Sequence, residues 1–428
     1  MKKVLIITYY WPPSGGAGVQ RMLKFVKYFP EFDVEPVILT VDENKASYQL
    51  IDNSLKNDIP SNIIIFKTST FEPFEFYKIL GKKKEIPHSG FANESNPSLF
   101  QKLMRFIRGN FFIPDARVGW NRYAYKMAVK IIETEKIDAV ITSSPPHSTQ
   151  LIGLKLKNKY KIKWIADLRD PWTDIYYYKQ MYHTKLAETI DKKYEKKVLE
   201  NSDAIIVVSK NIKEIFKSKT ETDIDNKIHI IPNGFDEDDF DRAKNIDSDE
   251  FLITYTGTYA DIYQIDGFLD AFKKFVNEFH DPNIKLRFIG KISDSLPEKI
   301  TNLKLDNYVE FKEYLPHKNS VNELLKSSAL LLIIPKMGKN EGILTGKLFE
   351  YLGSYKPIIC LGPLNGDAAK IINQCNAGEV FDYENSNNIF DYLRKIYLNR
   401  NNIVCNYLEI NKYTRKNLTK KLTEIINN

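Results

Sequence analysis

Short hydrophobic runs that alternate with helical patterns are the feature of this sequence that most restricts its fold. In the first half of the chain these runs lack polar alternation, which is typical of strands buried on both faces. Helical spacing separates several of them, most clearly from Val19 to Phe29. The alternation predicts a doubly wound parallel sheet. The expected strands are Val4–Thr8, Val34–Leu39, Ile63–Phe66, Ala139–Thr142, Trp164–Asp167 and Ala204–Ser209.

The pattern pauses at Ile228–Asp236 and then begins again. At 428 residues the chain exceeds the usual size of one hydrophobic core. We therefore predict an α/β protein with two Rossmann-like domains, residues 1–235 and 236–403, followed by a long helix over Val404–Ile426. The strands expected in the second domain are Leu252–Thr256, Leu286–Ile289, Val309–Lys312, Leu330–Ile334 and Ile358–Leu361.

Charge and cysteine content place the protein among ordinary globular proteins. A net charge of +7 is too small to indicate a nucleic-acid partner. The three cysteines form no CxxC pair, which favours reduced thiols in the cytoplasm. No apolar stretch reaches transmembrane length, and the run after Lys3 is too short for a signal peptide. We expect a cytoplasmic protein whose membrane contact, if any, is peripheral.

Ligands of open α/β sheets bind beyond the carboxyl ends of the strands, so the loops there are the candidate sites. The first such loop contains Gly15 and Gly16 and opens a helix. Glycines allow close approach to a phosphate, and the helix offers free N–H groups to an anion. The alternative is a turn that only needs flexible residues. A nicotinamide-dinucleotide site fits poorly, because Arg21 stands where a third glycine is needed.

Two further loops of the first domain carry polar candidates. His147 follows the fourth strand and could position an acceptor, although a histidine at such a junction is also often structural. Asp170, in the stretch Ala166–Trp172, could orient a sugar hydroxyl. An internal Asp–Arg pair that holds this loop is an equally good interpretation.

In the second domain, Gly257 and Thr258 end the first strand. Farther along, Thr345, Gly346 and Lys347 enter a helix. A cation is disfavoured in the first turn of a helix unless an anion is bound, so Lys347 is a candidate phosphate ligand. Glu350 lies on the same helix face and could accept both hydroxyls of a ribose. The alternative for these two residues is a surface i,i+3 ion pair.

A basic amphipathic segment covers residues 99–113. Phe100, Leu103 and Phe106 are interleaved there with Lys102 and Arg105. Such a helix indicates contact with an anionic membrane surface. The alternative is a helix packed on the first domain. Three DxD strings lie in polar linker, and we interpret them as solvated charge rather than metal ligands.

Together these residues resemble the GT-B glycosyltransferases, most closely the retaining GT4-type family, over nearly the whole chain. The resemblance rests on Gly15-Gly16, on the stretch Ile231–Asp236, on Lys347–Tyr351 and on Lys356-Pro357. It implies an N-terminal acceptor domain, a C-terminal donor domain and a terminal helix, about residues 404–428, that crosses back to the first domain. It also implies a nucleotide-diphosphate-sugar as co-substrate and no metal or other cofactor.

The resemblance assigns expected roles to individual residues. Gly16 approaches the donor pyrophosphate, and Glu350 matches the second Glu of the family's E-x7-E motif and holds the ribose. Backbone at Glu313 and Tyr314 meets the base, and Asn233 lies in the family's P-N-G-x-D stretch.

Two departures from the family pattern stand out. The first Glu of E-x7-E should fall at Gly342, so Glu341 is one residue early as a contact for the donor sugar. The family's basic clamp is replaced by Thr258 and neighbouring uncharged residues, so we hypothesise that Lys347, with Lys291 or Arg21, supplies the positive charge.

The expected reaction is sugar transfer to a glycan or lipid-linked acceptor of bacterial cell-surface polysaccharide synthesis. No hydrolase-type triad stands out, so electrostatic stabilisation of the departing nucleotide diphosphate would carry catalysis. Retention of configuration follows from the resemblance alone. The alternatives are an inactive sugar-nucleotide-binding subunit and a GT-B-fold epimerase, with an NAD enzyme as a remote option.

Overall fold

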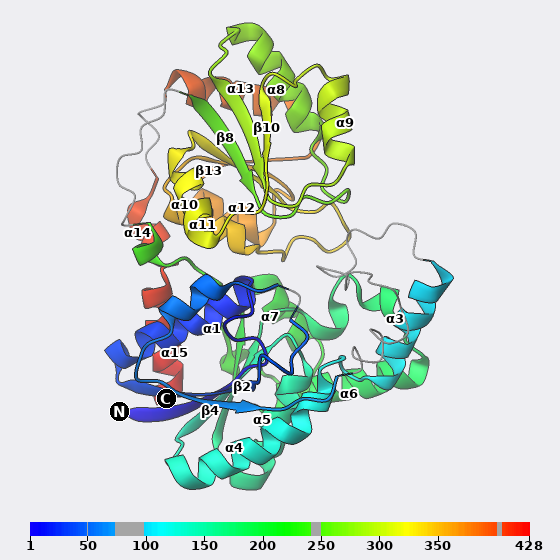
Figure 1. Ribbon diagram of the computed structural model, residues 1–428, viewed down its shortest axis with the longest axis vertical. Coiled ribbons are helices and arrows are strands. Elements are labelled where there is room, and N and C mark those ends of the chain that lie inside the picture. Colours follow the sequence, from blue (N-terminus) through cyan, green and yellow to red (C-terminus); the bar gives the residue numbers. More distant parts are fainter. Residues whose placement is uncertain (49, 73–97, 241–249, 400–404) are drawn as a thin grey trace. The chain divides into compact units, whose positions relative to one another are not determined.

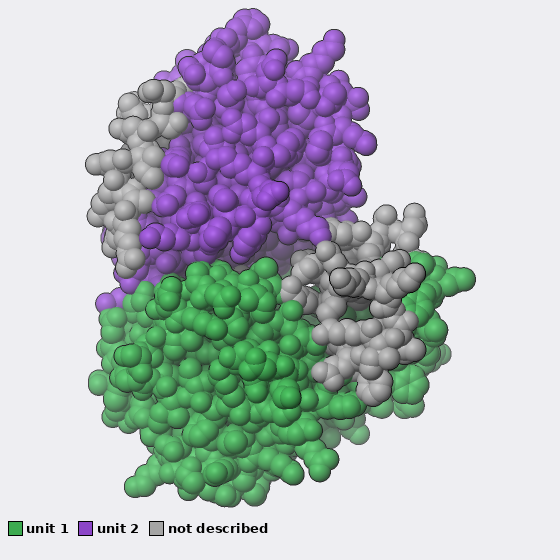
Figure 2. Space-filling view, viewed as in Figure 1, with its two compact units in different colours: residues 1–232, 418–428 green, residues 233–417 purple. Residues whose placement is uncertain are grey.

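The protein is described by a computed structural model that covers residues 1–48, 50–72, 98–240, 250–399 and 405–428. The chain forms two compact units, which Figure 2 colours separately. Unit 1 comprises Met1–Pro232 and Leu418–Asn428, and unit 2 comprises Asn233–Asn417. The expected boundary after residue 235 lies three residues beyond the observed one.

Unit 1 is built on a seven-stranded parallel sheet, as the unalternated hydrophobic runs predict. Its strand order is β3-β2-β1-β4-β5-β6-β7. The strands are β1 (Lys2–Ile7), β2 (Val34–Val41), β3 (Ile64–Thr68), β4 (Ala139–Ser144), β5 (Lys163–Leu168), β6 (Ala204–Val207) and β7 (Ile228–Ile230).

Helices cover both faces of this sheet (Figure 1). Along β1, Leu5 and Ile7 pack into one core and Val4 and Ile6 into the other. One core is closed by α4 and α5, the other by α1 and α15. The helices are α1 (Ala17–Tyr28), α3 (Leu99–Phe111), α4 (Asn121–Glu135), α5 (Ser148–Tyr160), α6 (Lys185–Asn201), α7 (Lys210–Lys217) and α15 (Arg415–Asn427).

Unit 2 repeats the plan with a six-stranded parallel sheet in the order β10-β9-β8-β11-β12-β13. Its strands are β8 (Phe251–Thr256), β9 (Ile284–Ile289), β10 (Val309–Lys312), β11 (Ala329–Ile333), β12 (Ile358–Leu361) and β13 (Gly378–Phe381). Its helices are α8 (Asp266–Phe279), α9 (Ser295–Asn302), α10 (His317–Lys326), α11 (Gly346–Gly353), α12 (Asp367–Gln374), α13 (Ser386–Leu398) and α14 (Tyr407–Asn411).

The fold class is therefore confirmed, with differences at its margins. Strands β7 and β13 were not expected; each is a short strand at the edge of its sheet. The prediction of a single terminal helix is wrong, because α14 and α15 are separate helices with a non-helical turn between them. There the backbone pairs with Phe235, which donates to Tyr413 O and accepts from Arg415 N, so a continuous helix cannot form. Residues 418–428 do return to unit 1, whose Lys2 and Lys163 bond carbonyls at the end of α15.

Candidate functional site

The strand order reverses once in each sheet, between β1 and β4 in unit 1 and between β8 and β11 in unit 2. Parallel sheets bind ligands beyond the carboxyl ends of the strands at such a switch point. The loops that follow these four strands are therefore the places to look. They carry most of the residues that the sequence singled out.

In unit 1, the glycines after β1 have two different roles. The N–H of Gly15 donates to Leu50 O at 2.9 Å, and a Cβ on Gly15 would lie 2.9 Å from the Leu50 side chain. Gly15 thus meets a packing demand. Gly16 has φ 103°, precedes α1 without a capping side chain, and has open space where a Cβ would stand. Gly16 therefore exposes the start of α1, as a phosphate-approaching loop requires.

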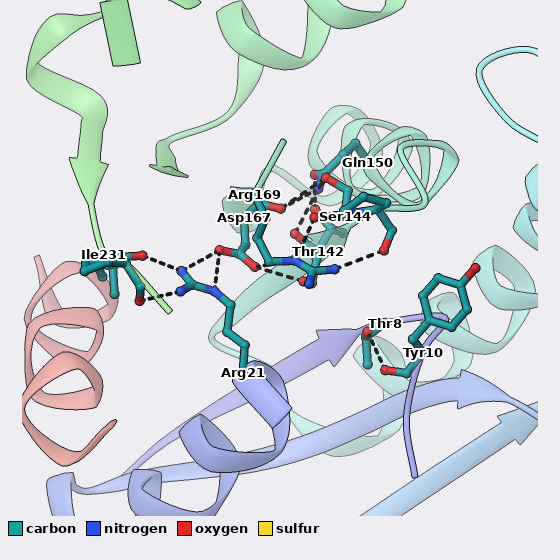
Figure 3. A network of polar contacts seen from close by, with 12 residues as sticks. Thr8, Tyr10, Arg21, Thr142, Ser144, Gln150, Asp167, Arg169 and Ile231 are labelled. Carbon is teal, nitrogen blue, oxygen red and sulfur yellow. Dashed lines mark hydrogen bonds and ion pairs between the residues drawn. The ribbon is translucent and has the colours of Figure 1, made fainter. Parts of the chain in front are cut away.

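Arg21 corrects the sequence interpretation. Its side chain is fully buried and donates to Asp167 Oδ1 at 3.0 Å and to the carbonyls of Ile231 and Pro232 at 2.8 and 2.7 Å. Figure 3 shows the guanidinium rising from α1 between these partners. The hypothesis that Arg21 supplies charge to the donor is wrong, because its charge is already neutralised inside unit 1. Arg21 instead fixes the last residues before the chain leaves the unit.

The expected Asp–Arg pair of the loop after β5 exists, but its carboxylate is Asp167 and not Asp170. Asp167 also accepts from Ser143 at 2.8 Å and lies 4.0 Å from Arg169. Arg169 donates to the carbonyls of Ser144 and Pro145. Its guanidinium occupies the space that a Cβ on Gly18 would need, which places this cation against the first turn of α1.

Asp170 is the carboxylate that this network leaves out. It is half-buried, and no hydrogen bond to it from the described residues is observed. Burial raises its pKa, while the neighbouring Arg169 acts in the opposite direction. A partly dehydrated carboxylate without a donor is available to accept a hydrogen bond from a ligand hydroxyl.

His147, after β4, is a neutral group with unused hydrogen-bonding capacity. Its ring stacks on Trp172 with centroids 4.7 Å apart and an interplanar angle of 15°. Both ring nitrogens are buried and have no partner among the described residues. Burial, together with the charges of Arg169 and Lys219, lowers the pKa of His147 to about 3. A neutral imidazole can donate from one nitrogen and accept at the other, but it cannot stabilise negative charge as a cation.

In unit 2, Lys347 lies against the turn after β8. The Lys347 ammonium donates to Tyr255 Oη at 2.6 Å and lies 4.0 Å from the centre of the Tyr255 ring. The Tyr255 hydroxyl in turn donates to Thr258 O at 2.7 Å. Gly257 has φ 95°, and a Cβ there would lie 2.8 Å from Lys347 Cε. Only glycine permits this close passage of the lysine stem.

No carboxylate of the described residues forms an ion pair with Lys347. Burial lowers its pKa to about 7, and the charge of Glu350 acts in the opposite direction. The expected alternative, a surface ion pair between these two residues, is wrong, since Glu350 pairs with His317 Nε2 at 3.1 Å. Tyr351 anchors the helix by accepting from the Thr256 backbone N–H at 3.0 Å. Helix α11 is thus fixed with its first turn at the end of β8.

The other predicted donor residues lie in unit 2 with mixed exposure. Thr345 Oγ1 at the start of α11 and Asn233 Oδ1 are buried without partners among the described residues. Gly346 is the first residue of α11. The more accessible residues, whose roles stay predictions, are Lys291, Glu313, Tyr314 and Glu341.

Several residues of these loops were not predicted. His317 was missed because its partner Glu350 lies 33 residues away. Tyr255 falls inside one expected strand and Asp167 at the end of another, and neither position by itself indicates a site residue. For Trp172, the run Arg169-Asp170-Pro171-Trp172 was the available signal, but only the fold shows that its ring covers His147.

Helix α3 packs on unit 1 through its polar face rather than through its apolar face. Arg105 and Gly109 are buried, and a Cβ on Gly109 would lie 2.6 Å from Met181 O. Asn110 binds the chain that leads into α6, donating to Tyr182 O and accepting from Thr184 N. The apolar side chains face outward, with exposed fractions of 85, 61, 54, 38 and 73% for Leu99, Phe100, Leu103, Phe106 and Phe111.

Within the described ranges, no helix is long and apolar enough to cross a bilayer. The same ranges contain no cluster of three or more His, Cys, Asp or Glu side chains arranged to hold a metal ion.

Comparison with known families assigns both halves of the chain. Residues 86–239 match the family described as Glycosyltransferase Family 4, and residues 236–417 match Glycosyl transferases group 1. The two adjoining matches together span 86–417. A comparison with curated proteins finds no match.

Solved structures share the fold at low sequence identity. HepE from Anabaena, in complex with UDP, is 11% identical with a TM-score of 0.61, and the match covers 100% of both chains. Sucrose-phosphate synthase from Thermosynechococcus elongatus is 11% identical with a TM-score of 0.62, covering 100% of this chain and 98% of that one.

A third similar structure is TarM from S. aureus, which is 14% identical with a TM-score of 0.62 and covers 100% of this chain and 99% of its own. Two parallel α/β units, family matches to both halves and these shared folds agree with one another. The chain belongs to the glycosyltransferases of the GT-B fold.

Proposed function

We propose that this protein transfers a sugar from a nucleotide-diphosphate-sugar to a glycan acceptor. The observation that carries the proposal is the arrangement around α11 in unit 2. A lysine that has no carboxylate partner among the described residues lies at the first turn of a helix, and its stem passes close to the glycine turn after β8. A bound anion would pair with both the lysine and the N-terminus of the helix.

Glu350 fits the next part of such a donor. It lies one turn after Lys347 on α11 and is held by His317 at 3.1 Å. A carboxylate oriented in this way accepts the two hydroxyls of a ribose. We infer that the diphosphate binds at Lys347 and Gly257 and the ribose at Glu350, with the base toward Glu313 and Tyr314.

Unit 1 supplies groups suited to a saccharide. Asp170 can accept from an acceptor hydroxyl, and the neutral His147 can donate and accept at its two nitrogens. The ring centroids of Tyr10, in the loop after β1, and of Tyr48 lie 6.1 Å apart. Hydroxyl-rich ligands with apolar ring faces match such mixed surroundings.

These residues would act on the reaction by electrostatic stabilisation. As the bond between the sugar and the diphosphate breaks, negative charge grows on the departing phosphate, and Lys347 with the amides of α11 is placed to stabilise it. We propose that the reaction retains configuration and needs no metal. Both points rest on the resemblance to GT4-type enzymes.

The first test is binding of nucleotide diphosphates to the whole protein. UDP is the natural first probe, because the HepE structures contain UDP or UDP-glucose. A ligand at a hundred times its Kd stabilises the native state by about 2.7 kcal/mol, so a clear rise in Tm is expected for the correct base. Release of nucleotide diphosphate only when a glycan acceptor is added would establish transfer. Binding without turnover would favour a non-catalytic sugar-nucleotide-binding subunit, and interconversion of the donor sugar would indicate an epimerase.

We also propose that the acceptor is lipid-linked or part of a bacterial cell-surface polysaccharide, reached from the cytoplasmic face of the membrane. The support is the outward apolar face of α3. Beside it, at the start of α6, Tyr182 and Leu186 are 40 and 71% exposed. Lys102 and Lys185 are exposed on the same two elements. Apolar side chains with neighbouring lysines match the interface of an anionic bilayer.

Replacing Phe100 and Leu103 by Ser is expected to weaken binding to vesicles that contain anionic lipid by at least about tenfold. Full burial of one such side chain contributes roughly 1.5–3 kcal/mol, and insertion at an interface buries part of it. Sedimentation with vesicles measures the effect. The control is Leu398→Ser, which removes an apolar side chain that is 61% exposed on unit 2. Equal binding of all three proteins would exclude α3 as the contact.

A further inference from the structure

Trp172, which covers His147, has a backbone conformation that costs free energy. Its φ is 29°, a region that side-chain-bearing residues rarely adopt. Such strain persists only where the surroundings impose it, and it concentrates at functional sites. The residue is also 2% exposed, so its conformation is set by packing and hydrogen bonds rather than by solvent.

Helix α6 supplies the groups that impose it. Asp191 Oδ1 accepts a hydrogen bond from Trp172 Nε1 at 2.9 Å, and Oδ2 accepts from the Tyr178 hydroxyl at 3.0 Å. One turn later, Glu195 accepts from the Thr173 hydroxyl at 2.6 Å and from Lys219 at 2.7 Å. Both carboxylates are 1% exposed. Burying two carboxylates costs free energy, and the hydrogen bonds that they accept offset part of that cost. The loop therefore depends on these bonds being made.

We infer that Asp191 is a positioning residue of the candidate site: through the Trp172 indole it sets the plane of His147, and it does not itself touch the substrate. The inference rests on the proposed function, since His147 is taken to meet a sugar hydroxyl. Among the described residues no group pairs with either nitrogen of His147, so the stacked indole of Trp172 is the contact that sets the plane of the imidazole. Whatever fixes the indole therefore fixes the directions in which His147 donates and accepts.

The charge state of Asp191 controls this hold. Burial raises its pKa to about 7, and the hydrogen bonds from Trp172 and Tyr178 lower it. Helix α6 packs against α3, α5 and the turn at Trp172–Asp174, and the buried face of α5 there is uncharged. The charged or titratable groups on and around these elements are Glu195, Asp115, Asp174, Lys219, Tyr178, His183, Arg105 and Arg108.

The sign of the expected pH dependence follows. Below pH 7 the Asp191 carboxyl is protonated, and its bond to the indole loses the strength that a charged acceptor gives. At saturating donor, kcat should therefore fall as the pH drops through about 7. Asp191→Asn imitates the protonated form, so its kcat should be about tenfold lower than the native value at pH 8 and should show no transition near pH 7, with the KM for the donor preserved.

Two companion variants separate positioning from general damage. Trp172→Phe keeps a ring over His147 but cannot donate, so its kcat should match that of Asp191→Asn, and the double variant should lose no more than either single one. Glu195 contacts the same loop at Thr173 and not at Trp172. Glu195→Gln should therefore keep the fall in kcat below pH 7. The inference would be overturned if the losses of kcat in the two single variants added up in the double variant. It would also be overturned if Asp191→Asn kept the fall in kcat below pH 7.

A readout without turnover distinguishes this inference from the proposed function. The difference in tryptophan fluorescence between the native protein and Trp172→Phe should titrate with a midpoint near pH 7, and Asp191→Asn should abolish that transition. If the transition is present but no sugar is transferred, the proposed function fails while the control of Trp172 by Asp191 holds. If the transition is absent, the inference fails whatever the activity.

Discussion

Replacing Lys347 by Ala is expected to weaken binding of nucleotide diphosphate by about 100-fold. A hydrogen bond to a charged group contributes roughly 1.5–3 kcal/mol, and each 1.4 kcal/mol is a factor of ten in Kd. Among the described residues, this ammonium contacts the Tyr255 hydroxyl and the rings of Tyr255 and Tyr263. A bound diphosphate would thus be its first anionic partner. Calorimetric titration with UDP, or with the base found by thermal shift, measures the change.

The controls test whether the effect belongs to this lysine. Lys395→Ala removes a lysine of unit 2 whose side chain is 62% exposed, and it should bind as the native protein does. Lys291→Ala tests the other lysine proposed for the donor and should cost much less, because Lys291 is exposed. Unchanged affinity in Lys347→Ala would remove the main support for a diphosphate site in unit 2.

The same lysine predicts how donor affinity depends on pH. Because burial lowers its pKa to about 7, the free protein carries the ammonium below pH 7 and loses it above. A bound diphosphate favours the charged form, so binding takes up a proton above pH 7. The apparent Kd should therefore rise up to about tenfold per pH unit above 7, and Lys347→Ala should lack this slope. A slope of the same size in the variant would assign the titration to another group.

The sequence predicts the fold more completely than it predicts the partners of the site residues. Buried strands such as Val4–Ile7 and Leu330–Ile333 are continuous apolar runs, so sequence locates them within a residue or two. Short edge strands such as β13 bury less and carry a weaker pattern. The break before α15 depends on pairing with Phe235, about 180 residues earlier in the chain, and no local signal contains it.

Sequence found the loops of the site but not the partners within them. It placed Lys347 beside a helix start and Gly257 at a strand end, since both follow from chain position. It misassigned Arg21 and did not find His317 as the partner of Glu350, because a charged side chain pairs with the group that the fold brings close. Whether Arg21 meets a phosphate or Asp167 is decided by the packing of α1 on the sheet, a long-range property.

Replacing Asp170 by Asn should lower sugar transfer by about 100-fold or more and leave nucleotide-diphosphate binding unchanged. General acid–base assistance by a positioned carboxylate contributes typically 10²–10⁴ in rate. The raised pKa of Asp170 means that folding disfavours its charged form, so the amide should not destabilise the protein at neutral pH. A loss of rate without a loss of Tm would mark a residue kept for function. Asp270→Asn, an exposed aspartate of α8, is the matched control. A rate within twofold of the native one would place the acceptor elsewhere, because no other described carboxylate of this loop lacks a partner.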